Sequence, residues 1–224
     1  MILHTLTLTF DRSRPIHGPA PELRTFFVTK FAEYAELHRQ DADTFIHRYP
    51  VVQCKMIRDV PTVIGINEGA VFLKQLADES REIQLGPGTY RIAEHDISMR
   101  DEEFGLSDTI HSYEFATPWV AFTQENYKRF YLLTGKPARD EFVRKILVDT
   151  ILSLSKSLGY NVPVPVSCDT NLHFQKDRLK GVSVMTFTGK FQVNFQIPDY
   201  LGIGKSVSQG FGAVRRIFRE IRKG

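Results

Sequence analysis

Eleven residues near the carboxyl end, GIGKSVSQGFG (202–212), combine four glycines with one lysine, a composition that lets a backbone approach phosphate groups. The Gly-Lys-Ser within them suggests the chemistry of a nucleotide-binding P-loop, in which main-chain N–H groups surround a triphosphate. That template requires a glycine where this chain has Asp199, and only twelve residues follow Gly212. The stretch therefore fits either a phosphate contact of another kind or a glycine-rich turn that needs no ligand.

Positive charge is concentrated around this stretch. The whole chain carries a net charge of only +3. Residues 1–100 contain 12 Lys/Arg and 13 Asp/Glu, whereas residues 176–224 contain 10 and 3, a local charge of +7 (10 − 3). This distribution is expected of a surface that meets a polyanion, although a solvated basic tail would have the same composition.

The remaining composition is that of an ordinary soluble protein. At 224 residues, the chain is long enough for one large domain or two of roughly 100 residues each. No run approaches the about 18 apolar residues of a membrane span, and the first ten residues alternate like a strand. Cys54 and Cys168 have no C-x-x-C partner. We expect a cytoplasmic protein that contacts no membrane and uses no metal or cofactor.

The elements that must position the glycine-rich stretch fall into two halves. In the first half, a period-2 strand at the amino terminus precedes a helix from about Pro21 to Arg39. Two strands (YPVVQCKMI and TVIGI), a helix that Asn67 could cap and further extended residues follow. The order β-α-β-β-α-β is ferredoxin-like. The acidic, turn-rich stretch 101–108 predicts a boundary, so we expect modules at 1–100 and 101–224.

The second half repeats this order with one change. A strand (109–122), helical residues 124–133 and 138–159, and two strands facing each other across KDRLKG are followed by the glycine-rich stretch and a last strand, FGAVRRIF. The stretch thus replaces the second helix. We predict an α+β fold of two tandem ferredoxin-like (RRM-like) modules with a cleft between them.

At this point the chain resembles a known family. FTGKFQVNFQIPDYLGIGKSVSQGFGAVRR, together with YPVVQCKMI and IGINEGA, resembles the CRISPR-associated repeat-processing endoribonucleases of the RAMP superfamily, whose hallmark is a carboxyl-terminal G-h-G-x5-G-h-G loop. Gly202, Gly204, Gly210 and Gly212 match its four glycines. The resemblance implies metal-independent cleavage of precursor CRISPR RNA within each repeat, which releases guide RNAs.

Such cleavage assigns roles to several side chains. RNA can be cut by its own 2'-hydroxyl if a base, an acid and a charge-stabilising group are present, and histidine suits the first two roles. His38 ends the first helix and His47 opens the next strand, so they are the leading catalytic pair. Period-2 alternation places Tyr49 and Lys55 on the face of His47, as a phenolic donor and a cation for the phosphate. Some family members have His-x-His where this chain has His38-Arg39-Gln40.

The basic carboxyl region is expected to bind CRISPR repeat RNA. The candidate contacts are Lys190, Gly202, Gly204, Lys205, Gly210, Gly212, Arg215 and Arg216. The alternative function is a catalytically silent RNA-binding subunit of a CRISPR effector complex. Other subunits of such a complex, and a second copy of this chain in a homodimer, are left open as further partners.

Overall fold

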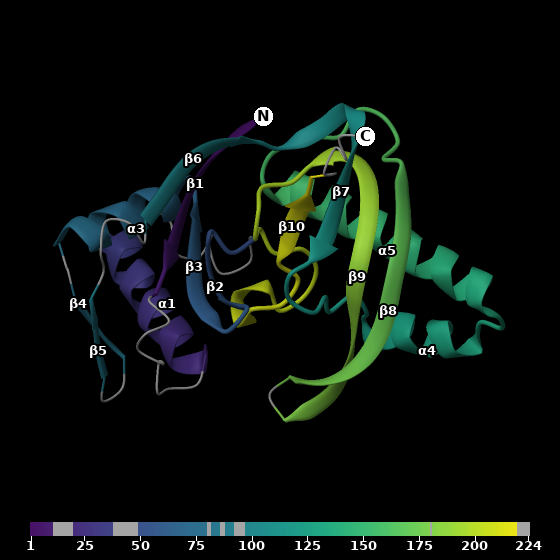
Figure 1. Cartoon of the computed structure of the whole chain (residues 1–224), viewed down its shortest axis with the longest axis horizontal. Helices are drawn as coiled ribbons and strands as arrows, with labels where there is room; N and C mark the ends of the chain where they lie inside the picture. The colour runs from purple at the N-terminus through teal and green to yellow at the C-terminus, as the bar shows by residue number, and fades with distance from the viewer. Residues whose placement is uncertain are drawn as a thin grey trace, which may run out of the picture. The chain divides into compact units, whose positions relative to one another are not determined.

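The computed structural model describes residues 1–10, 20–37, 49–79, 82–85, 88–91, 97–179 and 181–218. The chain forms two compact units (Figure 1). The first contains Met1–Glu103 and the short segment Ser206–Phe211, and the second contains Phe104–Lys205 and Gly212–Gly224. None of the helices in the described ranges is long and apolar enough to cross a membrane.

The first unit is a four-stranded antiparallel sheet with two helices. Its strand order is β2-β3-β1-β6, which is the ferredoxin-like order predicted from the sequence. A small hairpin is inserted before the last strand. The elements are β1 (Ile2–Thr9), α1 (Ala20–Leu37), β2 (Val52–Ile57), β3 (Val60–Ile66), α3 (Glu68–Glu79), β4 (Glu82–Leu85), β5 (Gly88–Arg91) and β6 (Ile97–Glu103).

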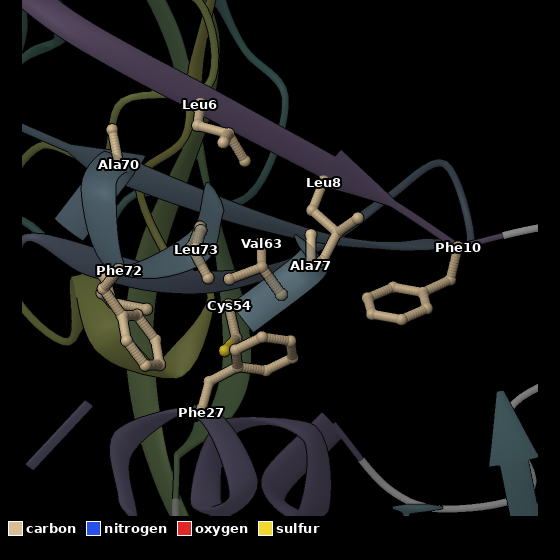
Figure 2. Packing of buried hydrophobic residues seen from close by; sticks show 11 residues of the cluster. Leu6, Leu8, Phe10, Phe27, Cys54, Val63, Ala70, Phe72, Leu73 and Ala77 are labelled. Atoms are coloured by element: carbon tan, nitrogen blue, oxygen red, sulfur yellow. The ribbon is translucent and has the colours of Figure 1, made fainter. Parts of the chain in front are cut away.

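The core of this unit lies between the sheet and its helices. Figure 2 shows Leu6, Leu8 and Val63 of the sheet facing Phe27 of α1 and Leu73 of α3, and all five side chains are buried. Alternation along β1 puts Leu6 and Leu8 on the same face. Burial of each such side chain contributes roughly 1.5–3 kcal/mol. The opposite face of β2 is thereby left for the odd-numbered residues.

Asn67 does not cap α3 as predicted. Its Oδ1 accepts the main-chain N–H of His4 at 3.1 Å, and its own N–H donates to the carbonyl of His4 at 2.7 Å. Its φ of +50° lies in the left-handed region that asparagine tolerates. The side chain therefore ties the end of β3 to β1, a pairing between distant segments that local capping rules do not contain.

The second unit repeats the fold with a second four-stranded antiparallel sheet, ordered β10-β7-β9-β8. If the four strands of each sheet are numbered 1 to 4 along the chain, both sheets have the order 4-1-3-2. The glycine-rich stretch occupies the place of the second helix, which confirms the predicted modified copy. The elements are β7 (Gly105–Phe115), α4 (Gln124–Leu132), α5 (Lys136–Ser157), β8 (Cys168–Leu179), β9 (Val182–Gln196), the short 3-10 helix η2 (Val207–Gln209) and β10 (Val214–Ile217). Of these, η2 belongs to the first unit.

Helices α4 and α5 form from clear local signals. The Thr123 hydroxyl accepts the N–H of Asn126 at 3.1 Å and caps α4. In α5, Val143, Leu147 and Ile151 recur at four-residue spacing and are buried. Figure 1 shows both helices on the same side of the sheet. The other face of this sheet carries mainly polar residues.

The stretch 101–108, predicted to be turn-rich, is almost entirely strand. β6 runs through Glu103, and β7 begins at Gly105, so the boundary between the units lies between two strands. The acidic side chains that suggest a turn are partly or fully exposed along these strands. The segment Ser206–Phe211 also returns to the first unit, which a single boundary cannot describe.

Candidate functional site

The two leading catalytic candidates, His38 and His47, lie outside the described residues. Of the predicted cluster, Tyr49 and Lys55 are described. Tyr49 is partly exposed and lies three residues before β2 begins at Val52, and α1 ends at Leu37. The described elements thus bracket the interval that contains both histidines.

Lys55 is buried and holds the middle of the glycine-rich loop. Its side chain is on the β2 face opposite the core, and the residue is only 2% exposed. Its Nζ donates to the main-chain carbonyls of Val207 at 3.0 Å and Phe211 at 3.1 Å. The sequence predicted a cation that faces the RNA phosphate. The structure shows an ammonium that donates to two protein carbonyls, which uses two of its three N–H groups.

Burial also changes the acid–base chemistry of this position. Burial lowers the pKa of the Lys55 ammonium from 10.5 to about 7, and the charge that Cys54 would carry as a thiolate opposes this effect. A neutral amine keeps two N–H donors, so both carbonyl contacts can survive deprotonation. Burial raises the pKa of the Cys54 thiol to about 12, which keeps it protonated near neutral pH.

The segment Ser206–Phe211 forms a tight turn stabilised by its own backbone. The carbonyl of Val207 accepts the N–H of Gly210 at 3.1 Å as well as the ammonium of Lys55, and the carbonyl of Ser206 accepts the N–H of Gln209 at 2.9 Å. Ser206 adopts a φ of +57°. The N–H of Gly210, a predicted RNA contact, is therefore used within the protein.

Two other glycines of the motif are required by contacts inside the second unit. A Cβ on Gly204 would lie 2.3 Å from Nε1 of Trp119, and a Cβ on Gly212 would lie 2.0 Å from the carbonyl oxygen of Ile203. Both have positive φ, +91° and +70°. These residues are glycine because of packing and backbone conformation, whatever else they contact.

The ends of the loop are paired with neighbouring backbone. The N–H of Gly212 donates to the carbonyl of Pro118 at 2.8 Å, and Gly202 forms a β-bridge with Ala213. The N–H of Lys205 donates to the carbonyl of Val120 at 3.0 Å, whereas the residue itself is exposed. The N–H groups of Gly210 and Gly212 are therefore hydrogen-bonded within the protein. The predicted RNA contacts of the loop glycines and of the Lys205 side chain stay predictions.

Lys190 and Arg215 lie together on the polar face of the second sheet. Strand register places each directly opposite Glu114 of β7, Lys190 from β9 and Arg215 from β10. Arg215 forms an ion pair with Glu114. The carboxylate between the two cations was missed in the sequence, because only strand pairing reveals it. It reduces the positive charge that a phosphate would meet here.

Arg216 points to the opposite face from Arg215, because neighbouring residues alternate along β10. Its guanidinium donates to Nδ1 of His111 at 2.6 Å and stacks over the ring of Phe218 at 5.4 Å. His111 is buried, and its Nε2 lies 2.9 Å from the hydroxyl of Ser107. Since a guanidinium can only donate, Nδ1 of His111 is the acceptor in this hydrogen bond. The predicted basic cluster is therefore divided between two faces.

Solved structures of several CRISPR proteins resemble this fold. A structure described as the CRISPR RNA processing endoribonuclease Cas6b is 29% identical, with a TM-score of 0.76 and coverage of 97% of this chain and 100% of that one. Another Cas6b structure is 30% identical, with a TM-score of 0.77 and the same coverage. A Thermus thermophilus Cas6 product complex, 14% identical over 96% of this chain and 99% of that one with a TM-score of 0.61, shows the fold alone.

Sequence comparisons point the same way. The Methanocaldococcus jannaschii protein MJ0978 is 38% identical over 139 residues, which is 61% of this chain and 93% of that protein. The family model of the Cas6b N-terminal domain matches residues 1–103, and that of the Cas6b C-terminal domain matches residues 105–217. Because the two models together span both units, the chain belongs to the Cas6b family of CRISPR RNA processing endoribonucleases.

Proposed function

We propose that this chain is a metal-independent endoribonuclease that cuts CRISPR repeat RNA in precursor transcripts and so produces guide RNAs. The observation that carries the proposal is the match of both units to Cas6b, including solved structures of about 30% identity over nearly the whole chain. The repeat RNA, rather than a nucleotide, is the proposed phosphate-bearing ligand.

In the proposed reaction, the 2'-oxygen of the RNA attacks the adjacent phosphorus atom and the bond from phosphorus to the 5'-oxygen breaks. A base accepts the 2'-proton and an acid donates a proton to the departing 5'-oxygen. The products are a 2',3'-cyclic phosphate and a 5'-hydroxyl, so no redox partner or water is consumed. His38 and His47 are the proposed base and acid, and Tyr49 is a proposed donor to the phosphate oxygens.

The described part of the chain supports this assignment through position. Lys55 donates hydrogen bonds to two carbonyls of the segment Ser206–Phe211 and so helps to order it. Tyr49 lies six residues before Lys55 in the chain. We assign Lys55 a positioning role toward the loop. Exposed Lys205, and Lys190 with Arg215 in the second unit, are the proposed contacts for the RNA backbone.

The test uses the full chain and a labelled repeat RNA from its own genome, incubated in excess chelator. We expect cleavage with a cyclic phosphate end, and we expect His38→Ala and His47→Ala each to abolish cleavage while RNA affinity stays within a few fold. His4→Ala is the matched control, because His4 is an exposed histidine on β1. It should cut at the normal rate.

Three results would reject parts of the proposal. Cleavage that appears only when magnesium is added would reject the metal-free mechanism. Normal cutting by both histidine variants would show that the catalytic residues lie elsewhere. Tight binding of repeat RNA with no cutting would favour the second candidate, a silent RNA-binding subunit. The presence of Gln40 where the His-x-His pattern has its second histidine also favours that candidate.

A further inference from the structure

A pocket of about 410 Å³ lies inside the second unit, between the turn that joins α4 to α5 and strand β8. Its floor is apolar, because Phe130, Val143 and Phe187 are buried. Lys136 and Arg139, on the first turns of α5, contribute polar groups to its wall. Its volume is within the range of about 300–1,000 Å³ found for sites that bind small ligands.

Exposed aromatic rings continue from this pocket along the surface. Phe174 of β8 packs edge-on against Phe130, with 5.8 Å between the ring centroids. The centroids of Phe130 and Tyr131 are 6.0 Å apart, and those of Tyr131 and Tyr127 are 4.8 Å apart. Three of these rings are exposed: Phe174 by 53%, Tyr131 by 49% and Tyr127 by 42%. Rings of this size are rarely left in water without a use, and here they are contiguous.

Cations are interleaved with these rings. Strand alternation places Lys176 on the same face of β8 as Phe174. The guanidinium of Arg139 lies over the ring of Phe130 at 5.3 Å. Lys136 is exposed and forms an ion pair with Asp140, which is the one carboxylate among the described residues that line the pocket. The surroundings are therefore net positive.

We propose that this pocket binds one unpaired nucleotide of an RNA strand, with its base against Phe174 and its flanking phosphates near Lys136 and Lys176. Aromatic faces alternating with cations are the arrangement that binds single-stranded nucleic acid, because every base has a face that can stack. The inference rests on the proposed function, since it assigns a further contact for the same RNA. It concerns the helix-covered side of the sheet, whereas Lys190 and Arg215 lie on the other side.

A protein partner fits these observations less well. Stable protein interfaces bury about 800 Å² on each partner and have an apolar centre with few charges. Here the apolar floor is recessed in a pocket, and Lys136 and Lys176 lie beside the contiguous rings. A negatively charged ligand with a flat ring satisfies both features.

The experiment uses the full chain and a ten-nucleotide oligouridylate that carries one 4-thiouridine. Ultraviolet crosslinking followed by peptide mapping locates the modified base, and fluorescence anisotropy gives the affinity. We expect a crosslink within residues 168–179. Phe174→Ala should remove this crosslink and weaken binding by about fivefold or more, whereas Phe174→Tyr should retain both. Lys176→Gln should make binding less sensitive to salt.

Leu132→Ala is the matched control, because Leu132 is 81% exposed near the same rings and lies outside the pocket lining. It should leave the crosslink and the affinity unchanged. Absence of the crosslink, or equal losses in Leu132→Ala and Phe174→Ala, would overturn the inference. Binding unaffected by both Phe174→Ala and Lys176→Gln would also overturn it and would favour a protein partner instead.

The failure of this inference and that of the proposed function are distinguishable. A repeat RNA that stays uncut, combined with a crosslink that depends on Phe174, would reject the proposed nuclease and support the pocket. A repeat RNA that is cut normally, with no crosslink on β8, would reject only the pocket.

Discussion

Replacement of Lys55 by methionine tests the buried ammonium directly. Burial lowers its pKa in the folded protein to about 7, below the 10.5 expected in the unfolded chain. Between these two values the unfolded chain binds more protons, so the free energy of unfolding rises with pH through this window. Below about pH 7 both states are protonated, and the full cost of burying the charge is present.

The size of the effect follows from the pKa difference. Each pH unit inside the window changes the free energy of unfolding by about 1.4 kcal/mol. Between pH 6 and pH 9, wild type should therefore gain roughly 2 to 3 kcal/mol relative to Lys55→Met, in which no charge titrates at this position. All other titrating groups are shared by the two proteins, so their contributions cancel in the difference.

The assay is urea unfolding followed by circular dichroism at pH 6 and pH 9. Lys74→Met is the matched control, because it removes an exposed lysine of the same unit, and its difference from wild type should be equal at both pH values. The reasoning is refuted if the difference between wild type and Lys55→Met is also equal at both pH values. In that case the ammonium keeps its charge throughout this range, and burial does not control it.

Two further predictions concern the glycine-rich loop and the polar face of the second sheet. Gly212→Ala should destabilise the second unit by at least about 3 kcal/mol, because its Cβ would overlap the carbonyl of Ile203. Gly181→Ala, whose Cβ meets nothing within 4 Å, should lower the free energy of unfolding by only about 1 kcal/mol. Equal losses of stability in the two variants, measured by urea unfolding monitored by tryptophan fluorescence, would contradict this account. Lys190→Gln should reduce the slope of log affinity for RNA against log salt by about 0.7, and an unchanged slope would exclude the contact. Glu114→Gln should tighten RNA binding.

Local patterns predicted the order of elements well. Period-2 alternation identified the strands, and the helical pattern of residues 138–159 identified α5, because these periods reflect which side of an element is buried. They were misleading at 101–108, where acidic residues and Gly105 suggested a turn and the chain forms two consecutive strands. Exposed strand positions accept charged residues, so composition alone cannot distinguish them from a loop.

Alternation also assigned residues to faces without showing what covers each face. It correctly separates Lys55 from the buried Cys54, yet the segment that covers Lys55 begins 151 residues later in the chain, at Ser206 (206 − 55). Likewise Arg215 and Arg216 are adjacent in a basic cluster, and strand geometry sends one to Glu114 and the other to His111.

The amino-acid sequence by itself determined the two ferredoxin-like modules, the replacement of one helix by a glycine-rich loop and the family resemblance, because each depends on periodicity and spacing within a few residues. Only the tertiary structure decided that Lys55 faces main-chain carbonyls, that Gly204 and Gly212 are required by packing, and that an aromatic pocket lies beside β8. Those features depend on contacts between segments that are distant in the sequence. The burial of the Lys55 ammonium and the close approach of backbone to the glycines arise only when the chain is folded.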